Sequence, residues 1–136
     1  MSARHKARKR ALDFLFESDI RKIDALELLA GRELSEISEG AYALEILQGV
    51  KLHKEKIDEL IISYAEGWDL DRMPVVDRNI IRIALFELFW SKSVPEDVVI
   101  SEALKLSDEN STADSTKYIN GVLSRILALK PSLNIN

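Results

Sequence analysis

Apolar residues recur at steps of three and four along most of the chain, a pattern typical of amphipathic helices. The pattern predicts helices over residues 3–19, 25–32, 38–64, 76–90, 95–106 and 115–127. Gly49 interrupts the third segment, which is therefore either two helices or one bent helix. With only five Gly and three Pro among 136 residues, the chain has few turns. We expect one all-α domain over 1–136, a compact bundle of six or seven helices.

One segment differs from the others because it is apolar nearly all round. Between Ile80 and Trp90 the only polar residues are Arg82 and Glu87, and a helix places them about 140° apart. The helix then has no separate polar and apolar faces, which is typical of a buried central helix. Fifteen residues are also too many for an ordinary strand.

Several classes of function are excluded by what the sequence lacks. Without cysteine there is no disulfide, thiolate chemistry or zinc finger, and a reducing cytoplasmic setting is expected. No phosphate-cradling glycine loop is present, and the two histidines lie far apart. Asp69-Leu70-Asp71 is better explained as a helix connection than as a cation site. We expect no enzyme, cofactor, metal site or membrane segment.

Charge is distributed unevenly along the chain. The net charge is −4, yet the first ten residues hold five of the 19 Lys and Arg residues and no acid. On a helix, His5, Arg8, Lys9, Leu12 and Phe16 lie within about 100° of one another, so cations precede an aromatic on one face. Spacing alone leaves three possibilities open: nucleic-acid binding, a solvated helix, or an acidic protein partner.

A second candidate lies at the start of the last helix, which Asp114 or Ser115 is expected to cap. Lys117 and Tyr118 follow within one turn and suit contacts with a phosphate and a base, although this segment taken alone favours core packing of Tyr118. Gly121 costs a helix about 1 kcal/mol relative to Ala, which suggests a close approach of another helix.

Three pieces in series resemble the NusB family of transcription antitermination proteins. They are Ile81-Arg82-Ile83-Ala84-Leu85-Phe86-Glu87-Leu88, then Val94-Pro95 with Ile100-Ser101-Glu102-Ala103-Leu104-Lys105-Leu106, then Lys117-Tyr118-Ile119-Asn120-Gly121-Val122-Leu123. The basic first helix is similar in kind, and residues 20–70 match only as helices.

The resemblance implies an all-helical, NusB-like fold in two small subdomains and a non-enzymatic function. Such a protein binds boxA-type RNA in nascent ribosomal RNA transcripts together with NusE, a ribosomal small-subunit protein. The pair helps assemble an antitermination complex on RNA polymerase. A homodimer, which would cover the RNA face, is compatible with the resemblance.

The resemblance also implies site residues. The RNA-binding candidates are Arg4, His5, Lys6, Arg8, Lys9, Asp114, Lys117 and Tyr118, and the partner-binding candidates are Phe16 and Asp77. His5 stands where arginine is common, and Phe16 lacks the hydroxyl of the more usual tyrosine. Asp114 is expected to read a base, and Tyr118 to stack on one.

This interpretation makes a geometric prediction: the first and last helices pack together, so that residues 4–10 lie near 114–118. Two competing functions remain. A purely protein-binding helical module needs no RNA contact, and an unrecognised hydrolase needs an acid–base pair in a pocket.

Overall fold

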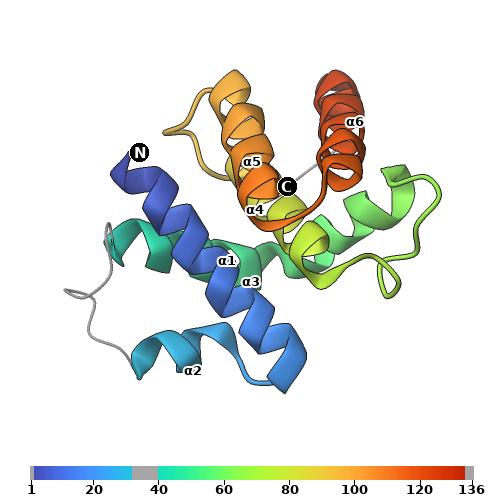
Figure 1. Cartoon of the computed structure of the whole chain (residues 1–136). Coiled ribbons are helices and arrows are strands. Elements are labelled where there is room, and N and C mark those ends of the chain that lie inside the picture. The colour runs from blue at the N-terminus through green and yellow to red at the C-terminus, as the bar shows by residue number, and fades with distance from the viewer. Residues whose placement is uncertain (1, 32–39, 134–136) are drawn as a thin grey trace.

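The computed structural model describes residues 2–31 and 40–133. Within these ranges the chain forms helices and connections, and no strand (Figure 1). The helices are α1 (Ala3–Arg21), α2 (Ala25–Ala30), α3 (Gly40–Tyr64), α4 (Val75–Phe89), α5 (Glu96–Asn110), α6 (Ala113–Leu129) and the short 3-10 helix η2 (Lys130–Ser132). The all-α prediction is confirmed, and the predicted start at residue 38 lies outside the described residues.

Short polar side chains begin three of the helices. Ser2 accepts a hydrogen bond from the His5 amide, and Asp24 accepts one from the Leu26 amide, as its predicted capping role requires. The last helix begins earlier than expected, because Thr112 is its cap and accepts from the Ser115 amide.

α3 is one continuous helix across Gly49. The reason for the glycine is a neighbour: a Cβ at position 49 would overlap the ring of Phe86 in α4. Gly121 is the opposite case: apart from its chain neighbours and its own helix backbone, no atom of the described residues lies within 4 Å of the place where its Cβ would be. The prediction of a close helix approach at Gly121 was therefore wrong, and the close approach occurs at Gly49.

The apolar segment forms the central helix, as predicted. α4 is buried on nearly all sides and packs against α1, α3, α5 and α6 (Figure 1). Its buried aliphatic side chains join those of the other helices in one hydrophobic cluster. Among the described residues, no helix combines the length and the apolar character needed to cross a membrane.

The first and last helices lie on different sides of this centre. α1 packs on α2, α3 and α4, whereas α6 packs on α3, α4 and α5. Figure 1 shows α5 between α1 and α6. The prediction that α1 and α6 pack together was wrong, because α5 occupies the place that the prediction gave to α6.

Candidate nucleic-acid interface

The basic residues of α1 divide into buried and exposed groups. Every third or fourth side chain of α1 faces α4 and α5, and His5 and Arg8 are on this face. Each of the two is only 3% exposed. Arg4 and Lys6 lie on the solvent side of the same turns.

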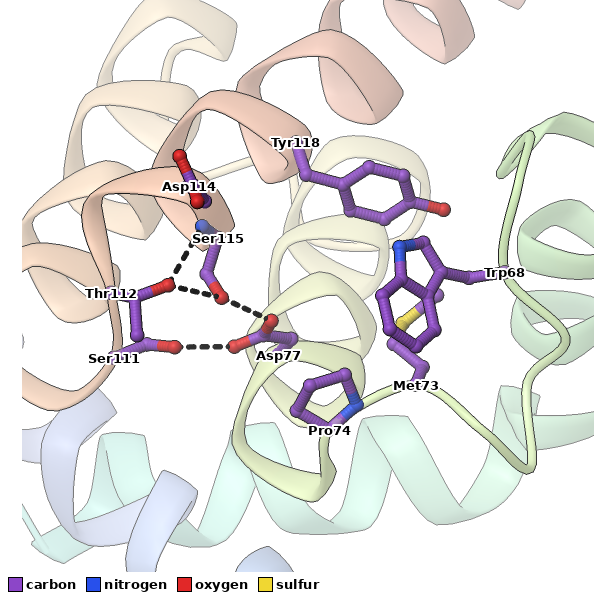
Figure 2. A pocket seen from close by; sticks show the side chains of 9 residues that line it. All are labelled: Trp68, Met73, Pro74, Asp77, Ser111, Thr112, Asp114, Ser115 and Tyr118. Atoms are coloured by element: carbon purple, nitrogen blue, oxygen red, sulfur yellow. Dashed lines mark hydrogen bonds between the residues drawn. The ribbon is translucent and has the colours of Figure 1, made fainter.

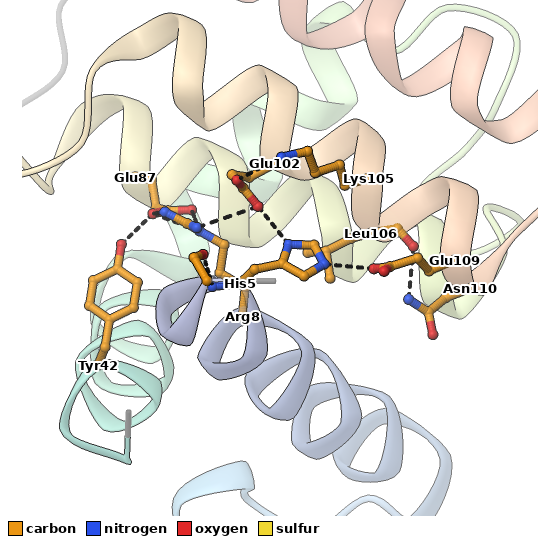
Figure 3. Close-up of polar contacts among 10 residues, drawn as sticks. His5, Arg8, Tyr42, Glu87, Glu102, Lys105, Leu106, Glu109 and Asn110 are labelled. Atoms are coloured by element: carbon orange, nitrogen blue, oxygen red, sulfur yellow. Dashed lines mark hydrogen bonds and ion pairs between the residues drawn. The ribbon is translucent and has the colours of Figure 1, made fainter. Parts of the chain in front are cut away.

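His5 is held between two carboxylates of α5 (Figure 3). Its Nδ1 lies 2.5 Å from Glu102 and its Nε2 lies 2.6 Å from Glu109. Ionised carboxylates only accept, so the imidazole donates to both when it carries two protons. Burial alone would raise the pKa of Glu102, but the hydrogen bonds from His5 and Lys105, together with the charges of Arg8 and Lys105, leave that pKa lowered.

Arg8 forms a two-pronged ion pair with Glu87 of the central helix. Its Nε and Nη2 each lie 3.0 Å from a Glu87 oxygen, and the Tyr42 hydroxyl donates to the same carboxylate (Figure 3). Burial opposes the charge on Arg8, yet the hydrogen bond and charge of Glu87 leave the Arg8 pKa raised. Burial and Glu87 together raise the pKa of Tyr42 as well.

The positions of His5 and Arg8 differ from the surface sites that the sequence suggested. Both side chains lie inside the molecule and join α1 to α4 and α5. The sequence shows a run of cations but not the acids that meet it, because those acids lie 79 to 104 residues away. A direct contact of either side chain with RNA stays a prediction.

The other cations of α1 keep access to solvent. Within the described ranges, Arg4 and Lys6 form no ion pair. The Arg4 guanidinium lies 4.4 Å from the centre of the Tyr42 ring, with its Nη1 3.4 Å from the Ser93 hydroxyl. Lys9 and Arg10 share Asp13, one turn along the helix, at 2.5 and 3.7 Å. Such exposed pairs are weak, and a phosphate can replace the carboxylate.

The start of α6 carries the second group of candidates. Asp114 and Lys117 are exposed, and Tyr118 is half-buried. The hydroxyls of Ser111 and Ser115 donate to the two oxygens of Asp77, at 2.7 and 2.6 Å. These bonds attach the junction of α5 and α6 to the start of α4 (Figure 2).

A cavity of about 350 Å³ lies beside this junction. Its lining comes from the start of α6, the start of α4 and the connection between α3 and α4 (Figure 2). The residues are Trp68, Met73, Pro74, Asp77, Ser111, Thr112, Asp114, Ser115 and Tyr118. Trp68 was missed in the sequence because a Gly-Trp-Asp segment looks like an ordinary connection, and no periodic pattern marks it.

The two groups of candidates are linked through α5, although α1 and α6 do not pack together. The contact between His5 and Glu109 brings the start of α1 to the last turn of α5. α6 begins only three residues after Asn110, the last residue of α5. Residues 4–10 and 114–118 thus flank opposite sides of α5.

The two partner-binding candidates do not share a surface. Phe16 is 41% exposed and lies beside Ile20, another exposed apolar residue on α1. Asp77 is 3% exposed and lies beneath the start of α6. Phe16 thus keeps a face for a partner, whereas the Asp77 carboxylate is occupied within the chain.

Among the described residues there is neither a cluster of three potential metal ligands nor a nucleophile bonded to His5. Within residues 2–31 and 40–133, no three His, Asp or Glu side chains gather so as to hold a metal ion. The two ring nitrogens of His5 lie within hydrogen-bond distance of carboxylates, and no nucleophilic side chain bonds to that ring.

Comparison with known proteins gives one family. The model of the NusB family matches residues 5–128. The transcription antitermination protein NusB of Acidothermus cellulolyticus is 49% identical over 129 residues, which cover 94% of this chain and 89% of that protein. Among solved structures, T. maritima NusB superposes with a TM-score of 0.86 at 32% identity, covering 94% of this chain and 92% of that one.

A second solved structure contains partners. It holds the antitermination factors NusB and NusE in complex with double-stranded RNA, and its matching chain has a TM-score of 0.83 at 29% identity. The match covers 94% of this chain and 98% of that one. Fold, family model and relatives agree over nearly the whole length, and the chain therefore belongs to the NusB family.

Proposed function

We propose that this protein is a non-enzymatic transcription antitermination factor of the cytoplasm. It binds boxA-type RNA in nascent ribosomal RNA transcripts together with NusE, and the pair helps assemble an antitermination complex on RNA polymerase. The observation that carries the proposal is the agreement of fold and sequence with NusB along nearly the whole chain. The relatives' names describe a role in transcription and not a catalytic one.

Exposed residues on both sides of α5 provide the RNA contacts. Arg4 and Lys6 of α1, and Lys117 of α6, neutralise phosphates. Asp114 accepts hydrogen bonds from the amino or imino groups of a base, because a carboxylate repels phosphate. His5 and Arg8 support the contact indirectly by fixing α1 against α5 and α4.

NusE docks on the exposed apolar surface of α1. Phe16 and Ile20 lie one turn apart, and Asp13 and Glu17 flank them. The rim carries both signs of charge, since Arg21 also lines it and pairs with Glu17. An apolar pair with a charged rim suits a protein partner, because the pair is buried on binding and the rim charges favour a complementary surface. Asp77 acts from inside, by holding the start of α6 in place.

A binding titration tests the proposal. Fluorescence anisotropy with boxA-type RNA and a scrambled RNA, each with and without NusE, should show tighter and salt-sensitive binding to boxA, strengthened by NusE. Tyr118→Leu should weaken boxA binding more than binding to the scrambled RNA.

The exposed pair of Phe16 and Ile20 also suits the second candidate, a protein-binding module without RNA activity. The two candidates differ in the same titration. NusE binding without any measurable RNA binding, alone or in the mixture, would favour the second candidate and contradict the first.

A further inference from the structure

The cavity beside the start of α6 has aromatic walls. Trp68, which is 47% exposed, and Tyr118 both line it, and Figure 2 shows the Tyr118 ring above the Trp68 ring at one end. Met73 and Pro74 contribute apolar surface next to them. A volume of about 350 Å³ is near the lower end for small-molecule sites, which begin at about 300 Å³, and suits a flat group of one or two rings.

Two of the residues that line the cavity carry polar groups that a ring-shaped ligand could use. The Tyr118 hydroxyl oxygen is buried and has no hydrogen-bond partner among the described residues. Burial raises the pKa of Tyr118, so the hydroxyl keeps its proton and stays a donor. A buried donor without an acceptor is unfavourable, and a ligand with an acceptor on its edge removes that cost. Asp114 supplies an acceptor at the rim.

The cavity is also held open by the fold around it. Asp77 fixes Ser111 and Ser115, which form one wall. On the other side, Gly67 has a φ of 86°, a left-handed conformation that side chains rarely adopt, and Trp68 follows directly. Met73 forms the next part of the wall, and its backbone N–H donates a hydrogen bond to the Asp69 carbonyl at 3.0 Å. A site formed before binding loses less free energy to ordering when the ligand arrives.

These features together fit a nucleobase better than an amino-acid side chain. A base offers a π-face for Trp68, donors for Asp114 and acceptors for the Tyr118 hydroxyl. The exposed Lys117 next to Tyr118 suits the phosphate that every base of an RNA brings with it. We infer that this cavity holds one unstacked base of the bound RNA and that Trp68 is a stacking residue for it. The inference rests on the proposed function.

Trp68→Ala tests the inference in the full-length chain with NusE present. Loss of one base-stacking contact should weaken binding of boxA-type RNA about 5- to 150-fold. Trp68→Phe keeps an aromatic face and should restore most of the affinity. Leu52→Ala is the matched control, because Leu52 is a highly exposed apolar residue on α3 and should leave the affinity unchanged.

Abasic substitutions in the RNA locate the base. Each nucleotide is replaced in turn by an abasic one. At one position we expect the replacement to weaken binding to the wild-type chain, and to cause no additional loss of affinity in Trp68→Ala. Tryptophan fluorescence reports RNA binding near Trp68 in a chain that keeps this residue. The chain has two tryptophans, so Trp90→Phe leaves Trp68 as the only reporter, and RNA should quench it.

The outcomes separate this inference from the proposed function. If the wild-type chain and NusE bind no RNA, the proposed function fails. If they bind RNA but Trp68→Ala binds it equally well, and Trp68 fluorescence is unchanged on binding, only this inference fails. Loss of NusE binding by Trp68→Ala, with RNA binding intact, would overturn the inference and assign the cavity to a protein side chain. If Trp68→Ala does not fold, quenching in Trp90→Phe decides.

Discussion

At the scale of single residues, Arg4 and Arg8 are one helical turn apart and have opposite environments. Arg8 is buried against Glu87, and Arg4 is exposed over the Tyr42 ring. Arg8→Ala leaves Glu87 buried without its main counter-charge, so we expect the free energy of unfolding to fall by about 3–5 kcal/mol. Arg4→Ala should change it by less than about 0.5 kcal/mol and weaken RNA binding.

Urea unfolding of the two variants and the wild type measures this difference. A stable Arg8→Ala protein with weakened RNA binding would instead make Arg8 a contact residue. The sequence could not separate the two arginines, because composition and spacing show a cation but not its partner. Burial of Arg8 depends on Glu87, 79 residues away. Lys117 is exposed, as a phosphate contact requires, and its contact with RNA stays a prediction.

At the scale of helices, most of the fold could be predicted because helical periodicity is local. The central helix and the cap at Asp24 followed from the pattern of residues within each segment. That local pattern did not predict which helices are neighbours. The predicted contact between α1 and α6 was wrong because α5 lies between them, and a single sequence contains no direct measure of that order.

Two of the helical glycines, Gly49 and Gly121, give a prediction at this scale. Gly49→Ala should destabilise the protein, because the new Cβ meets the Phe86 ring and overpacking costs about 1–3 kcal/mol. Gly121→Ala should stabilise it by up to about 1 kcal/mol, since the position is open and Ala favours helix. Thermal unfolding by circular dichroism measures both, and shifts of the same sign would contradict the assigned environments.

At the scale of the whole molecule, carboxylates with lowered pKa hold α1 in place at both ends. For Asp19, burial alone would raise the pKa, but hydrogen bonds from Asn79 and Arg78 and the charge of Arg82 leave it lowered. The pKa of Glu102, which contacts the other end of α1, is also lowered. A carboxyl with a lowered folded-state pKa stabilises the fold above its unfolded-state pKa and loses this effect as pH falls through the folded-state value.

We therefore expect the free energy of unfolding to stay level between about pH 7 and 5 as far as these carboxyls contribute, and to fall below about pH 4.5. Glu102→Gln keeps an acceptor for His5 but cannot titrate, so its stability should depend less steeply on pH in the acid range. Urea unfolding at several pH values measures this. Equal acid slopes for variant and wild type would exclude a linkage through Glu102.

The salt dependence of RNA binding follows from how the whole molecule distributes its charge. The chain is acidic overall, and of the basic residues near its start only Arg4 and Lys6 are exposed without a carboxylate partner in the described ranges. With Lys117, three cations meet phosphates, and at about −0.7 per phosphate the log–log slope of affinity against salt should be about −2. Five cations would give about −3.5.

Asp13→Asn releases Lys9 and Arg10, so this variant should bind RNA more tightly at low salt and with a steeper slope. A wild-type slope already near −3.5, unchanged in Asp13→Asn, would mean that the pairs with Asp13 open when RNA binds and do not limit the number of phosphate contacts.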